Sequence, residues 1–151
     1  MAHELRRTHP EVRCSWVGGE PAPAERFAVL LAAVGVPSQH LDAVAGRRPG
    51  TVLLVPSRED PFPLVVLEAG ARGLPAVAAA TGGLPELLGH GRGWVVPGHD
   101  LAALAEAVAE ALDAPDDAAA RGEALRFEVA ARHAPAVVGP AWLAAVLGPL
   151  A

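Results

Sequence analysis

Residues 51–69 read TVLLVPSREDPFPLVVLEA, and this stretch decides the fold class. Its first part, residues 51–56, is an unbroken apolar run of the kind found in a central strand that is buried on both faces. A short polar loop follows, and Pro63 then falls in the first turn of a helix, where its missing N–H is not needed. We expect this helix to run to Arg72 and to close at Gly73. A buried strand, a loop and a helix in succession form the repeating unit of an α/β sheet.

Short β-type runs and longer alanine-rich helical runs alternate on both sides of this stretch. A parallel sheet covered by helices produces that pattern. The other expected strands are residues 12–17, 75–79 and 93–97, and the other expected helices are residues 22–34, 84–88, 100–112, 116–133 and 137–147. Residues 38–50 suit no single element. We therefore predict one α/β domain over residues 1–151, with a Rossmann-like parallel sheet flanked by helices and with no linker or second domain.

The composition argues against several classes of protein. Hydrophobic residues make up 52% and charged residues 19%, which is typical of a globular chain and not of a disordered one. The net charge of −5 and the scattered arginines argue against binding to nucleic acid. No signal peptide opens the chain, and the most apolar stretch, residues 134–151, is too interrupted by glycine and proline to span a membrane. We expect a cytoplasmic protein.

The metal-binding residue types do not indicate a metal centre. The single cysteine, Cys14, lies in an expected strand, where a small buried hydrophobe is the simplest interpretation. The six histidines show no paired ligand spacing. We expect neither a metal ion nor another cofactor.

The loop after residues 51–56 is the expected ligand site. Ligands of an open α/β sheet bind beyond the carboxyl ends of the strands, where helix N-termini present free amides. Here the amides of Phe62, Leu64 and Val65 would face the crevice, which suits an anion such as the diphosphate of a nucleotide. Glu68 follows about one turn later, and its carboxylate could accept two hydrogen bonds from a ribose diol.

Several motifs follow one another along the chain: residues 16–19 (WVGG), 56–69, 73–77 (GLPAV), 81–87 (TGGLPEL) and 93–100 (GWVVPGHD). In this order they resemble the C-terminal, donor-binding domain of GT-B glycosyltransferases, specifically the retaining enzymes of the family 4 type, or glycosyl transferases group 1. The resemblance is strongest over residues 52–112. It implies a Rossmann-like fold and a nucleotide diphosphate sugar as the donor substrate, bound without a metal ion.

The resemblance also implies roles for individual residues. The family has two acids separated by seven residues, the second contacting the ribose and the first the donor sugar. Counting back from Glu68 gives Asp60, where the family usually has glutamate. Asp60 also suits a turn before Pro61, and the pair Gly82-Gly83 suits a tight turn before a helix. The expected donor-binding residues are Gly18, Gly19, Asp60, Phe62, Leu64, Val65, Glu68, Gly82 and Gly83.

Two departures from the family pattern bear on activity. Family members have a separate N-terminal acceptor domain, and an arginine and a lysine ahead of the WVGG strand neutralise the leaving diphosphate. Neither feature is recognisable here. The segment between Pro37 and Thr51 is also too short for the strand and the helix that the family has there. We expect a chain that is inactive or nearly so when alone.

Three functions remain open at this stage. The first is the donor-binding half of a retaining hexosyltransferase whose acceptor domain is supplied by another chain or lost by truncation. The second is a non-catalytic remnant that serves as a binding or assembly module, through a partner chain or as a homo-oligomer. The third, another Rossmann-type nucleotide binder such as an NAD-dependent enzyme, is disfavoured because no Gly-x-Gly-x-x-Gly opens a helix after the first strand.

Overall fold

The computed structural model describes residues 50–98 and 100–148, together with residues 7, 9, 10, 16, 17, 38 and 39. Its central sheet has three parallel strands in the order β3-β4-β5. They are β3 (Leu53–Val55), β4 (Ala76–Ala79) and β5 (Trp94–Val96). A second parallel pair joins β1 (Trp16–Val17) to β2 (Ser38–Gln39). The predicted parallel α/β architecture is confirmed.

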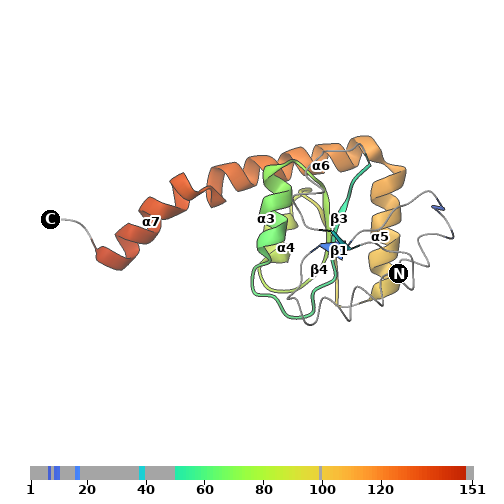
Figure 1. Ribbon diagram of the computed structural model, residues 1–151, viewed down its shortest axis with the longest axis horizontal. Helices are drawn as coiled ribbons and strands as arrows, with labels where there is room; N and C mark the ends of the chain where they lie inside the picture. Colours follow the sequence, from blue (N-terminus) through green and yellow to red (C-terminus); the bar gives the residue numbers. More distant parts are fainter. Residues whose placement is uncertain are drawn as a thin grey trace.

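Helices cover both faces of the central sheet (Figure 1). On one face lie α3 (Leu64–Ala71) and α4 (Leu84–Leu88), and on the other lies α5 (Leu101–Asp113). α6 (Pro115–Glu128) crosses from the α5 side to the α3 side and continues into a π-helical turn, η2 (Val129–His133). The last helix, α7 (Pro135–Leu147), projects away from the sheet (Figure 1).

The predicted elements agree with these bounds to within a few residues, with three differences of interest. Pro63 is the N-cap of α3 and not a residue of its first turn. The expected helix over residues 116–133 ends in a π turn. Residues 38–50, to which we assigned no element, begin with β2, which pairs Ser38 with Trp16. Four features of the sequence lie outside the described residues: the expected helix over residues 22–34, and Cys14, Gly18 and Gly19.

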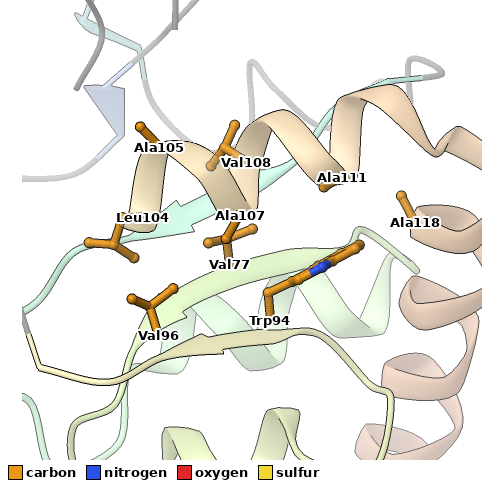
Figure 2. Packing of buried hydrophobic residues seen from close by; sticks show 9 residues of the cluster. All are labelled: Val77, Trp94, Val96, Leu104, Ala105, Ala107, Val108, Ala111 and Ala118. Carbon is orange, nitrogen blue, oxygen red and sulfur yellow. The ribbon is translucent and has the colours of Figure 1, made fainter. Parts of the chain in front are cut away.

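β4 lies at the centre of the sheet and separates two apolar cores, because successive side chains of a strand point to opposite faces. Figure 2 shows the core on the α5 side, where Val77, Trp94 and Val96 face the buried side chains of α5. The core on the other face contains Ala76 and Ala78 with buried residues of α3, α4 and α6. The alanines of β4 let helices approach both faces closely.

Trp94 of β5 and Trp142 of α7 differ in environment. Trp94 is buried, and its indole Nε1 donates a hydrogen bond to Glu110 Oε1 at 2.9 Å. The guanidinium of Arg121 stacks on its ring, 4.3 Å from the centroid. Trp142 is 60% exposed on α7, so it is not a core residue.

α7 has no buried residue. Its exposed large side chains are Val137, Val138, Trp142, Leu143, Val146 and Leu147. Within the described ranges, no helix is both long enough and apolar enough to cross a membrane.

Candidate donor-binding site

Two connecting segments lie against each other where β3 and β4 end. The first is the 56–63 loop, which leads from β3 to α3, and the second is the 80–83 turn, which leads from β4 to α4. The amide of Gly83 donates a hydrogen bond to the Pro61 carbonyl oxygen at 2.9 Å. The hydroxyl of Thr81 donates another to the Arg58 carbonyl oxygen at 3.2 Å. These bonds tie the loop to the turn at the carboxyl edge of the sheet, where ligands of α/β proteins bind.

The two glycines of the turn make this contact possible. Gly82 has φ +50°, and a Cβ atom there would overlap the carbonyl oxygens of Asp60 and Pro61. A Cβ atom at Gly83 would lie 2.5 Å from Cδ2 of Phe62. The predicted tight turn is confirmed, and the close approach that these glycines permit is to the protein's own loop. Their contact with a donor remains a prediction.

Asp60 stabilises the 56–63 loop through a hydrogen bond within it. Its Oδ1 atom accepts a hydrogen bond from the amide of Phe62 at 3.1 Å. A short aspartate side chain commonly stabilises a turn by bonding the backbone two residues further on. In this structure the Phe62 amide, expected to face the donor, is therefore occupied by Asp60. The sugar contact proposed for Asp60 remains a prediction.

The N-terminus of α3 is open. No side chain caps the helix, and its first turn has no acidic residue. The described part of the chain provides no acceptor for the amides of Leu64 and Val65. Unsatisfied amides together with the positive end of the helix dipole favour an anion at such a position. The geometry thus suits the phosphate site expected from the sequence.

Glu68 lies one turn after Leu64 on the same side of α3, since residues four apart share a helix face. Both residues are exposed, and Leu64 is 67% exposed. The Glu68 carbonyl oxygen accepts a hydrogen bond from Arg72 Nη1 at 2.9 Å, whereas its carboxylate has no ion-pair partner in the described part of the chain. The carboxylate is therefore available to a ligand that approaches the start of α3. The neighbouring acid of the loop, Glu59, is exposed to solvent.

Sequence reasoning missed one residue of this region. The imidazole of His133, at the end of η2, lies against the phenyl ring of Phe62. The ring centroids are 5.7 Å apart and the ring planes are inclined by 36°. No local pattern could have indicated this contact, because the two residues are far apart in the sequence and meet only through the packing of α6 and η2 on α3.

Residues 35–126 match the family model described as "Glycosyl transferases group 1". A D-inositol 3-phosphate glycosyltransferase of Streptomyces scabiei is 44% identical over 88 residues, which is 58% of this chain and 19% of that protein. Its counterpart in Acidothermus cellulolyticus is 37% identical over 129 residues, which is 74% of this chain and 29% of that protein. The chain thus spans less than a third of the length of these curated relatives.

Two solved structures have the same fold. A sucrose-phosphate synthase of Thermosynechococcus elongatus superposes with a TM-score of 0.78 and 28% sequence identity, covering 95% of this chain and 40% of the synthase. TarM superposes with a TM-score of 0.75 and 14% identity, covering 94% of this chain and 30% of TarM. These neighbours are GT-B proteins, and the α/β Rossmann-like fold of this chain is the one they contain.

Proposed function

This chain belongs to the glycosyl transferases group 1 family, and we propose that it is the donor-binding half of a nucleotide-sugar-dependent, retaining hexosyltransferase. In this proposal residues 1–151 are one nucleotide-sugar-binding domain. Family membership and the GT-B fold support the reaction class. The start of α3 supports the assignment to the donor, because its open amides lie about one helical turn from the exposed carboxylate of Glu68, which has no ion-pair partner among the described residues.

The chemistry of transfer assigns each group a task. Departure of a nucleoside diphosphate leaves negative charge on its phosphates, and prearranged amides at a helix N-terminus stabilise such charge. The amides of Leu64 and Val65 would serve this purpose. Glu68 would accept hydrogen bonds from the ribose hydroxyls, and Asp60 would contact the sugar. Because the helix supplies the positive potential, the proposal needs no metal ion.

The acceptor belongs, in this proposal, to a domain that the described chain does not supply. The curated relatives are several times longer than the region that they share with this chain. An acceptor domain in another chain, or elsewhere in the same enzyme, would complete the active site. The donor domain alone would bind a nucleotide sugar but transfer it slowly or not at all. A cytoplasmic location is part of the same proposal.

The single observation that carries this function is the position of Glu68 beside the open start of α3, and calorimetric titration with UDP, GDP and ADP tests it. We expect saturable binding of one of the three, unaffected by a metal chelator. Glu68→Ala should weaken it by about ten- to a hundredfold, the range for a lost hydrogen bond to a charged group. Glu106→Ala removes an exposed glutamate of α5 and should leave binding unchanged. Failure of all three nucleotides to bind would refute the donor-binding function.

A second candidate, a non-catalytic binding or assembly module, is favoured by α7. This helix of 13 residues is apolar on every side, and none of its residues is buried. Helices that are apolar all round are normally enclosed by other protein or by membrane, and exposed apolar patches mark interaction surfaces. At 13 residues α7 is shorter than the roughly 20 residues needed to cross a bilayer. A protein partner or a second copy of the chain would cover it.

Light scattering over a range of protein concentrations tests the surface of α7. We expect self-association, or association with an added acceptor domain, that is lost when Trp142 and Val146 are both changed to glutamate. Leu101→Glu and Phe127→Glu together add the same charge at exposed apolar positions outside α7 and serve as the control. Association without any nucleotide binding would favour the module over the enzyme. A chain that stays monomeric and pairs with no acceptor domain would eliminate the module.

A further inference from the structure

Phe62 contacts two segments that follow it in the sequence. Cδ2 and Cε2 of its ring lie so close to Gly83 that a Cβ atom there would be 2.5 and 2.8 Å away. The ring of His133 lies at a centroid distance of 5.7 Å. The phenyl ring, although 37% exposed, thus contacts both segments. Aromatic rings at this distance and inclination attract each other through their quadrupoles.

The position of His133 depends on close packing between α3 and the α6–η2 segment. Gly70 of α3 has no side chain, and a Cβ atom there would lie 2.8 Å from Cγ of Leu125 and 2.9 Å from Cγ2 of Val129. Leu125 and Val129 are both buried. This close approach brings η2 alongside α3 and places its last residue at the loop that precedes α3.

The π turn itself contributes to this placement. A π turn contains more residues than an α turn, so it changes the direction in which the following side chains point, and such turns are frequent at functional sites. His133 is the last residue of η2, and the backbone becomes extended at Ala134, with φ −65° and ψ 142°. The imidazole is therefore presented at the point where the chain leaves the domain to form α7.

We propose that His133 is a positioning residue for the donor site. Its ring holds Phe62 against Gly83 and thereby keeps the 56–63 loop on the 80–83 turn. Pro63, the N-cap of α3, is the last residue of this loop, so the loop sets the position of the open amides of Leu64 and Val65. The assignment to a donor rests on the proposed function, whereas the hold on the loop is a property of the ligand-free protein.

Hydrogen exchange of the Gly83 amide tests the hold on the loop without any ligand. This amide bonds the Pro61 carbonyl oxygen, so it exchanges when the loop lifts from the turn. His133→Ala should speed its exchange by about two- to tenfold, the range that an aromatic pair contributes. His133→Phe keeps a ring at the position and should restore the native rate. Arg132→Ala changes an exposed neighbour in η2 and should have no effect.

The amides of buried β4 report on the stability of the whole domain in the same experiment. If they speed up as much as Gly83 in His133→Ala, the effect is global and the positioning role is wrong. An unchanged Gly83 rate in His133→Ala would also overturn the proposal, as would a His133→Phe variant that exchanges like His133→Ala.

Nucleotide binding gives a second, separate readout. For the nucleotide that the native chain prefers, His133→Ala should weaken the diphosphate more than the free nucleoside, because the amides set by the loop face the phosphates. An equal loss for both would contradict positioning of the phosphate site. If the native chain binds no nucleotide, the donor-binding function fails, while the exchange experiment still decides whether His133 holds the loop.

Discussion

Gly82 touches the backbone of Asp60: at φ +50° the turn presents its α-carbon to the Asp60 carbonyl oxygen and leaves no space for a Cβ atom. This contact joins the connections that follow two neighbouring strands. Together with the hydrogen bond from Gly83 to Pro61, it makes the loop and the turn a single unit. The start of α3, where the donor is proposed to bind, is built on that unit.

Gly82→Ala should therefore strain the backbone of the turn and also disrupt its contact with the 56–63 loop. An L-residue at positive φ costs about 1–2 kcal/mol, and forcing a methyl group into a packed contact costs about 1–3 kcal/mol more. Gly91→Ala is a matched control, because Gly91 also has a positive φ, +77°, but has nothing within 4 Å of its Cβ position. Denaturant unfolding should show the larger loss for Gly82→Ala. Equal losses of unfolding free energy in the two variants would mean that the loop moves to accommodate the methyl group without a free-energy cost.

Arg121 and Arg126 lie on the same helix but should differ in their effect on stability. Arg121 stacks on Trp94, and its Nη1 atom donates to the Gly93 carbonyl oxygen at 3.0 Å. Arg126 makes an exposed ion pair with Glu123 at 2.7 Å. We expect Arg121→Ala to lower the free energy of unfolding by about 1–2 kcal/mol and Arg126→Ala by no more than about 0.5 kcal/mol, in urea titrations. A larger loss for Arg126→Ala would contradict this assignment.

Gly122 of α6 should not tolerate a methyl group. A Cβ atom there would overlap the Gly73 carbonyl and lie 3.0 Å from the nitrogen of Pro75, so backbone would have to move. We expect Gly122→Ala to destabilise the domain by about 1–3 kcal/mol, measured by thermal unfolding. Gly139→Ala, in open space on α7, should be neutral or stabilising by up to about 1 kcal/mol, because alanine favours a helix. Comparable losses at both positions would argue against a close contact at Gly122.

Much of the fold could be predicted from the sequence because its signals are local. The apolar run before Pro56 and the uninterrupted helical pattern after Pro63 identify a strand and a helix without knowledge of their partners. The start of α5 is equally local, because the Asp100 carboxylate caps this helix by accepting hydrogen bonds from the amides of Ala102 and Ala103. Each of these signals acts within one turn or one strand, so neighbouring residues suffice to recognise it. The motif order then indicated the family, which the match over residues 35–126 shows.

The tertiary structure alone decided how the candidate site is held together. Sequence reasoning placed Gly82-Gly83 in a turn but could not say that the turn packs on Asp60 and Phe62. It assigned His133 and Trp142 to helices but could not say what either side chain contacts. These relationships depend on how α6 and η2 pack along α3 and on where α7 leaves the domain. Periodicity specifies which face of a helix is apolar, whereas only the assembled chain determines which distant residue that face meets.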